Sequence, residues 1–325
     1  MTLHMLDPID MSPWAGREDP EPDSPRWHQV VEPLTVGSPV GVALLGFACD
    51  AGVARNQGRI GAAGGPRAIR KALANLAWHR RAPAHDAGDV VCHGHGGDDG
   101  METAQRRLAE CLATLLAAGH LPIVLGGGHE VAFGSWSGLA RHLEARSSGN
   151  GVPTIGIVNL DAHFDLRDPS RLCSSGTPFA QIAGECEARG WPFRYACLGV
   201  SRAANTRALF KRAADLEVLV REDHEITSTS LGAIGDELDA FIAGCDHLYL
   251  TIDLDVLPAG EAPGVSAPAA HGVALPLLER LVERVRDSGK LRLADVAELN
   301  PSLDIDGRTA KAAARLIHQL TLDAS

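Results

Sequence analysis

The chain has 325 residues, of which 45% are hydrophobic and 22% charged, a composition typical of a globular protein with a sizeable core. Its formal net charge of -11 and the lack of any Lys/Arg block argue against nucleic acid or an anionic membrane as a partner. The seven cysteines include no C-x-x-C pair, which argues against both a disulfide scaffold and a thiolate zinc site. With no export signal and no membrane-length apolar run, we expect a cytoplasmic protein that acts on a small molecule.

Two segments of different character are expected. Residues 1–38 are rich in Pro, Asp and Glu and show no sustained period, so we expect an irregular N-terminal arm packed on the outside. No linker composition interrupts residues 39–325. We therefore expect one domain after the arm.

Strand and helix patterns alternate through this domain. Continuous apolar runs, typical of strands covered on both faces, begin at residues 40, 122, 154, 195, 247 and 293. Helical patterns lie between and around them, near residues 66–78, 103–119, 131–146, 203–214, 230–243, 276–288 and 307–321. This alternation predicts an α/β fold with a mainly parallel sheet, in which ligands bind beyond the carboxyl ends of the strands.

Four of the expected strands end in side chains of the kind that bind metals. They are His129 in "LGGGHE", the trio Asp161, His163 and Asp165 in "NLDAHFD", the pair Asp253 and Asp255 in "TIDLDVLP", and Glu298 in "AELNP". Residues i and i+2 of an extended segment point the same way, so the pair shares a face, and so does the trio if the extension continues.

A single Asp after a strand is usually a turn or helix cap, but a cluster is hard to explain that way. Two carboxylates 4 Å apart repel by about 4 kcal/mol at an effective dielectric of about 20, and four aspartates add several such terms. Two divalent cations would balance them. Imidazole and carboxylate ligands without thiolate favour Mn²⁺, with Fe²⁺, Co²⁺ and Zn²⁺ as alternatives.

The motifs "GGGHE", "DAHFD", "TIDLDVLP" and "ELNP", in this order, resemble the metal motifs of the ureohydrolase (arginase and agmatinase) family. The stretches "RNQGRIGAAGGPRAIR", "SSGTPF" and "SRAANTRALF" resemble the branch of that family that hydrolyses N-formimidoyl-L-glutamate, so the likeness covers nearly everything after residue 40. The resemblance implies a three-layer α/β/α catalytic domain with an eight-stranded, mainly parallel sheet, in a homo-oligomer.

The same resemblance implies a site with two Mn²⁺ ions per subunit. His129 and Asp165 would bind one ion, His163 and Asp255 the other, and Asp161 and Asp253 would bridge both. A metal-bridging hydroxide would attack the formimino carbon, Glu298 would hold the amidine nitrogens, and Asp165 would carry the proton to the leaving nitrogen. The products would be L-glutamate and formamide, as in histidine degradation.

The glutamate end of this substrate needs cationic or amide partners. Arg167 is the first candidate, with Asn56, Arg59 and Arg202 as further ones. Ser175 stands where arginases and agmatinases carry a His, which argues against arginase activity, although Ser175 is equally explained as a loop hydroxyl. Two alternatives stay open: a ureohydrolase that releases urea from a guanidino acid or agmatine, and a catalytically silent metal-binding relative.

Overall fold

The computed structural model describes residues 9–146 and 151–323. In chain order its elements are α1 (Trp27–Val30), β1 (Glu32–Pro33), β2 (Val42–Ala48), α2 (Ala51–Arg55), η1 (Ala62–Gly64), α3 (Gly65–Ala74), β3 (Ala84–Val91), α4 (Met101–Ala117), β4 (Leu121–Leu125), α5 (Val131–Arg146), β5 (Ile155–Leu160), α6 (Pro178–Arg189), β6 (Arg194–Val200), α7 (Arg207–Asp215), β7 (Leu219–Glu222), η2 (Asp223–Glu225), α8 (Leu231–Ala243), β8 (His247–Asp253), η3 (Leu254–Val256), α9 (Leu275–Asp287), β9 (Leu291–Ala297) and α10 (Arg308–Thr321). Within these residues no helix is both long and apolar enough to cross a membrane.

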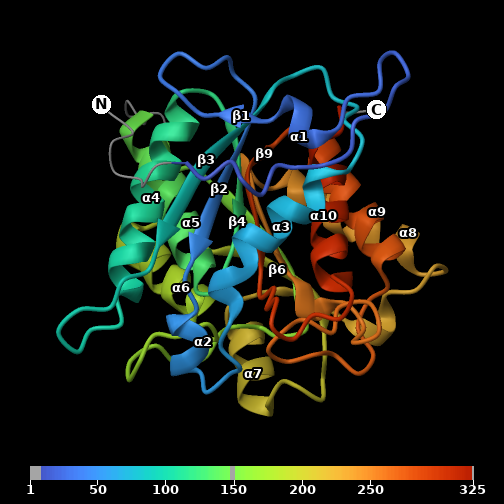
Figure 1. Cartoon of the computed structure of the whole chain (residues 1–325). Helices are drawn as coiled ribbons and strands as arrows, with labels where there is room; N and C mark the ends of the chain where they lie inside the picture. The colour runs from blue at the N-terminus through green and yellow to red at the C-terminus, as the bar shows by residue number, and fades with distance from the viewer. Residues whose placement is uncertain (1–8, 147–150, 324–325) are drawn as a thin grey trace.

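The strands form one sheet in the order β1-β3-β2-β4-β9-β8-β5-β6-β7. Figure 1 labels β3, β2 and β4 of this sheet. Each neighbouring pair is parallel, as the alternating pattern predicts. The expected count of eight is wrong by one, because the short strand β1 adds to the edge beside β3. Two exposed residues that include a proline carry no apolar period, so the sequence pattern does not reveal this strand.

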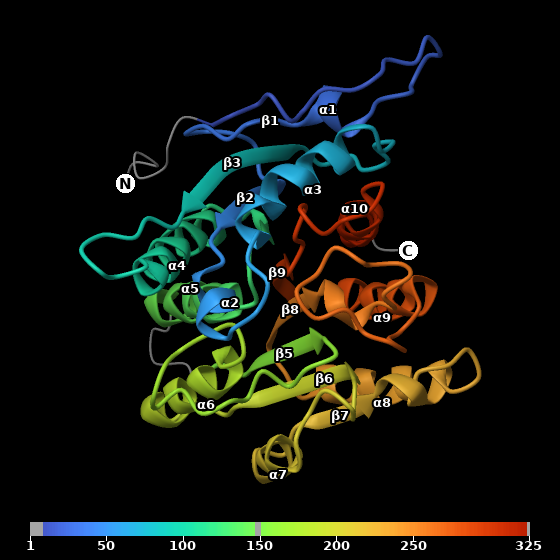
Figure 2. The same ribbon diagram turned by 60° about the horizontal axis from the view of Figure 1, so that its bottom comes forward.

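Helices cover both faces of the sheet, so the expected three-layer α/β/α arrangement is confirmed. Figure 2 shows α4, α5 and α6 on one face and α3, α10, α9 and α8 on the other. Each face has its own apolar core: one packs Leu108, Leu112 and Trp136 against the sheet, and the other packs Leu73, Leu281 and Leu316. The apolar faces of these helices are therefore buried on the strands, as their 3.6-residue periods predict.

The arm is not wholly irregular, which corrects that expectation for residues 9–38. It contains α1 and β1, and Trp14 and Trp27 are buried. The Nε1–H of Trp14 donates to Oδ2 of Asp86 at 2.6 Å, and Arg70 donates to the same oxygen at 2.7 Å. The arm is thus attached to β3 and α3 through buried groups, while the division of the chain at residue 38 stays a prediction.

Four strands at the centre of the sheet position the site. They are β4, β9, β8 and β5, which are neighbours in space although they come from distant parts of the chain. These are the strands that precede His129, Glu298, the Asp253/Asp255 pair and the Asp161–Asp165 segment. Because all are parallel, their carboxyl ends lie at one edge, where the four motifs meet.

Candidate metal centre

A glycine turn brings His129 to the edge of the sheet. Strand β4 ends at Leu125 and α5 begins at Val131. In the turn between them a Cβ on Gly127 would lie 1.7 Å from the carbonyl oxygen of Cys49, so only glycine allows this approach. The backbone N–H of His129 then donates to Oε1 of Glu298 at 2.9 Å.

The segment after β5 leaves the extended conformation as soon as the strand ends. The side chain of Asp161 accepts the N–H of His163 at 2.6 Å, which turns the chain, and Asp165 has a left-handed φ of 46°. The condition of continued extension is therefore not met, and a turn brings the three side chains together instead. Asp253 accepts the N–H of Asp255 at 2.9 Å in the same way and begins η3.

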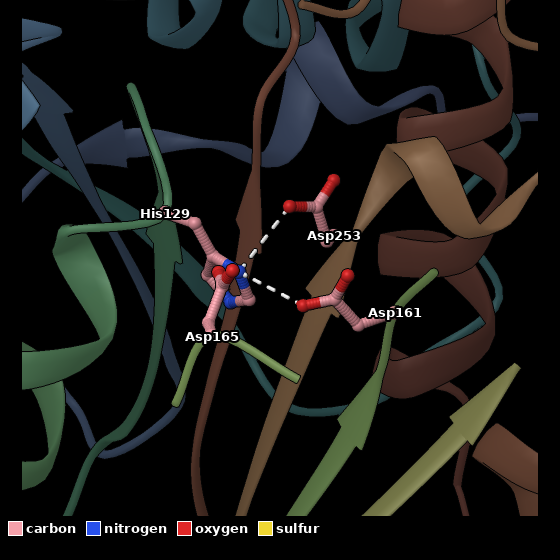
Figure 3. A group of neighbouring side chains, drawn as sticks. All are labelled: His129, Asp161, Asp165 and Asp253. Carbon is pink, nitrogen blue, oxygen red and sulfur yellow. Dashed lines mark ion pairs between the residues drawn. The ribbon is translucent and has the colours of Figure 1, made fainter. Parts of the chain in front are cut away.

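His129 lies at the centre of the first group of ligand-type side chains (Figure 3). Its Nδ1 is 2.9 Å from Asp165 Oδ2, 3.1 Å from Asp161 Oδ2 and 3.2 Å from Asp253 Oδ2. All three carboxylates point toward this nitrogen. They come from the loop after β5 and the end of β8, so the site depends on strand pairing between distant segments.

A second group adjoins the first and shares one member with it. It consists of Asp161, His163 and Asp255, with His163 Nδ1 at 3.0 Å from Asp255 Oδ2 and 3.6 Å from Asp161 Oδ1. Asp161 therefore presents one oxygen to each histidine. Asp253 falls in the first group only, so its bridging role stays a prediction.

The electrostatics of the first group fit a bound cation. Nδ1 of His129 is buried and forms no hydrogen bond with any described residue, although three carboxylate oxygens surround it. Burial raises the pKa of Asp253 well above its usual range, and the charges of Asp255 and Asp161 add to this rise. Burial and Asp161 likewise raise the pKa of Asp165. A divalent ion bound by nitrogen and carboxylate ligands would relieve this repulsion, and the donor set is one that Mn²⁺ accepts.

A cavity of about 340 Å³ opens onto both groups. Its lining includes the predicted substrate-binding residues Asn56, Arg59, Arg167, Ser175 and Glu298. Two donors of Arg59 are used by loop carbonyls, with Nε bonded to Ser266 O at 2.9 Å and an Nη bonded to Val265 O at 2.6 Å.

Arg202 is not among the residues that line the cavity, so its substrate role stays a prediction. Its guanidinium group forms an ion pair with Glu222 and lies over the ring of Phe210, 4.8 Å from the centroid. These contacts connect Arg202 to Glu222 at the end of β7 and to Phe210 in α7. Neither partner is adjacent to Arg202 in the sequence, so the sequence analysis did not identify them.

Asn205 belongs to the site and was missed by the sequence analysis. It lines the cavity, its Nδ2 donates to Ala162 O at 2.9 Å, and its Oδ1 accepts the N–H of Phe164 at 3.1 Å. These bonds fix the loop that carries Asp161 and His163. A polar residue in a loop has no periodicity that would mark it.

The chain is similar to known proteins over most of its length. The arginase family model matches residues 40–322. The formimidoylglutamase of Aeromonas hydrophila subsp. hydrophila is 58% identical over 322 residues, which are 98% of this chain and 99% of the relative. The formimidoylglutamase of Ralstonia nicotianae is also 58% identical, over 95% of this chain and 94% of the relative.

Solved structures show the same fold. The crystal structure of Trypanosoma cruzi formiminoglutamase with Mn²⁺ has a TM-score of 0.77 and 25% identity, covering 92% of this chain and 98% of the other. Formimidoylglutamase from Bacillus subtilis has a TM-score of 0.78 and covers 94% of each chain. The chain belongs to the arginase family.

Proposed function

We propose that this protein hydrolyses N-formimidoyl-L-glutamate to L-glutamate and formamide at a centre of two Mn²⁺ ions. The observation that carries the proposal is the pair of adjoining histidine–carboxylate groups that share Asp161 and whose other members line one cavity. The proposed substrate is taken from two relatives named formimidoylglutamase, which match almost the whole chain at 58% identity.

The ligands divide between two positions. His129, Asp161, Asp165 and Asp253 would hold one ion, and Asp161, His163 and Asp255 the other. The family resemblance adds Asp253 as a second bridging ligand. When bound, such ions supply Lewis-acid activation of water at neutral pH. The protein's own groups then have to orient the formimino carbon and manage the protons.

Glu298 is placed to hold the amidine end of the substrate. It lines the cavity, and the N–H of His129 fixes its Oε1, which leaves the second oxygen for the substrate. Burial, together with the charge of Glu130, raises the pKa of Glu298 to about 8. A cationic formimino group beside Glu298 would stabilise the ionised carboxylate and form charge-assisted hydrogen bonds with it.

Expulsion of the glutamate nitrogen requires a proton, and Asp165 is the candidate carrier. Its side chain lines the same cavity as Glu298, and only one of its oxygens is needed near His129. The other oxygen is available for the leaving group.

Arg167 is placed to bind the carboxylates of the substrate. Its side chain lines the cavity and is exposed, and within the described part of the chain no ion pair engages its guanidinium group. Asn56, Ser175 and the remaining donors of Arg59 line the same space. A bidentate Arg–carboxylate contact would select a glutamate derivative over agmatine, which has no carboxylate.

Product analysis tests the proposal. The purified chain, loaded with Mn²⁺, is incubated separately with N-formimidoyl-L-glutamate, a guanidino acid and agmatine. We expect glutamate and formamide from the first substrate in equal amounts. Urea from a guanidino substrate without turnover of the first would refute the proposed substrate, and ammonia with formylglutamate would indicate a deiminase. No turnover of any of the three substrates would favour a catalytically silent relative.

A further inference from the structure

Buried polar groups on β8 and β9 lie behind His129, outside the cavity lining. Thr251 Oγ1 is 3.0 Å from His129 Nε2, on the opposite side of the ring from the three carboxylates. Thr251 lies directly opposite Asp295 in the register of the two strands. The Tyr249 hydroxyl donates to Asp295 Oδ2 at 2.5 Å, and both Thr251 and Asp295 have no exposed surface.

A carboxyl group in the middle of a core strand needs an explanation, since burying it without hydrogen bonds is costly. Burial raises the pKa of Asp295, and hydroxyl groups of Ser135, Thr251 and Tyr249 offset part of this rise. Oδ1 of Asp295 is the buried oxygen that Tyr249 leaves unpartnered. A threonine hydroxyl can rotate about its C–O bond to reach such an acceptor.

The direction of these bonds decides which nitrogen of His129 carries the proton. Thr251 has one hydroxyl proton, and a carboxylate is the stronger acceptor for it. With that proton on the Asp295 side, the Thr251 oxygen accepts from His129, so the proton of the imidazole resides on Nε2. Nδ1 then presents its lone pair to the three carboxylates and to a metal held among them.

We infer that Thr251 and Asp295 are positioning residues that hold His129 in the tautomer whose Nδ1 binds metal. This inference rests on the proposed metal centre. Because the contact is made to His129, and His163 belongs to the other group, the effect should fall on one of the two ions.

Metal titration of the full chain tests the inference without measuring activity. The metal-free protein is titrated with Mn²⁺ by calorimetry. Thr251→Val removes the hydroxyl and keeps the shape. We expect the affinity for one ion to fall by roughly 10- to 100-fold, the range for partners of a ligating histidine, while the other stays within about threefold. Thr251→Ser keeps the hydroxyl and should restore both affinities to within about threefold of the original.

Asp295→Asn is the second variant, and circular dichroism checks that each variant folds. An amide N–H facing Thr251 would turn the hydroxyl proton toward His129, so the same ion should bind more weakly. A folded Thr251→Val protein that binds both ions like the original would overturn the inference. If Thr251→Val does not fold, a folded Asp295→Asn protein that binds both Mn²⁺ ions with the original affinities would also overturn the inference. Failure of the original chain to bind Mn²⁺ would refute the metal centre itself, which is a different result.

Discussion

Asp161 is the residue on which both ligand groups depend. Its Oδ2 faces His129, its Oδ1 faces His163, and Asn159 Nδ2 donates to Oδ2 at 2.9 Å. It has no exposed surface, and although this burial by itself would raise the pKa of its carboxyl group, His129 and His163 hold that pKa below its usual range. The shared position makes Asp161 the side chain whose change should affect both of the proposed ions together.

Asp161→Asn should therefore remove metal from both positions. A neutral amide offers one oxygen and less charge, so we expect bound Mn²⁺ after dialysis to fall at least roughly 10-fold and turnover to fall with it. Elemental analysis measures the metal. Asp168→Asn is the matched control, because Asp168 is exposed and lies outside the cavity lining. A full complement of metal in Asp161→Asn would contradict the assignment.

Arg167→Ala tests the substrate contact. Removing hydrogen bonds to a charged carboxylate costs about 1.5–3 kcal/mol, so KM for N-formimidoyl-L-glutamate should rise roughly 10- to 100-fold with a small change in kcat. Steady-state kinetics measure both constants. Arg202→Ala serves as control, since its guanidinium group is paired with Glu222 away from the cavity. Equal effects of the two variants would remove the support for Arg167.

At the scale of elements, the carboxyl ends of β4, β9, β8 and β5 create the site. The turn between β4 and α5 leaves no room for larger side chains, because its backbone packs directly against Cys49. The N–H of Gly128 donates to Cys49 O at 2.9 Å. Two non-glycine residues at the same edge of the sheet have a positive φ: Asp165, after β5, at 46° and Glu298, after β9, at 70°. Such strained backbone is tolerated where surrounding contacts hold it, as at many functional sites.

Gly127→Ala should disturb this turn. The added Cβ would collide with Cys49 O, so the backbone must move and carry His129 with it. We expect a loss of at least about 2 kcal/mol in the free energy of unfolding and weaker Mn²⁺ binding. Chemical unfolding and metal titration measure the two effects. Gly232→Ala in α8 is the control, since nothing lies within 4 Å of its added Cβ, and it should leave stability equal or higher. A Gly127→Ala protein that matches the original in both measurements would show that the turn can relax.

At the scale of the whole molecule, the arm and the metal centre lie at different ends. Figure 1 shows the arm and β1 at the top of the view and α2 and α7 at the bottom. Trp14 stacks on Trp27, with ring centroids 6.4 Å apart, and Trp27 packs edge-on against Trp78 at 4.7 Å. Residues 9–38 thus contribute apolar contacts and buried hydrogen bonds, such as those of Trp14 and Leu34 to Asp86, and none of these residues lines the cavity.

Trp14→Ala should lower stability and leave the metal centre intact. Loss of a buried tryptophan costs roughly 3–5 kcal/mol, and it also leaves Asp86 without one of its donors. Urea unfolding of the Mn²⁺-loaded protein measures the loss, and turnover should stay within about twofold of the original, since no cavity contact changes. Trp14→Phe keeps a smaller aromatic ring and loses the N–H bond to the Asp86 carboxylate, so a loss of about 1.5–3 kcal/mol is expected. A large fall in turnover would link the arm to the site.

The sequence by itself determined the α/β class and the ligand types. Apolar runs fully covered in a parallel sheet, such as β5, and amphipathic helices, such as α4, carry periods that can be read directly. Strands β3 and β7 and helix α6 were not predicted. Strand β3 contains Asp86, whose charge is balanced by Arg70, and this compensation is invisible until the two side chains meet.

Only the tertiary structure decided how the ligands group. Sequence spacing would place Asp161, His163 and Asp165 on one face only if the strand continued. The chain instead turns after Leu160, and the sharing of Asp161 follows from that turn. Strand order β4-β9-β8-β5, the pairing of Arg202 with Glu222, and the contact between Thr251 and His129 are all set by packing between distant segments. Local periodicity encodes which face of an element is buried, whereas the partner across that face depends on the whole chain.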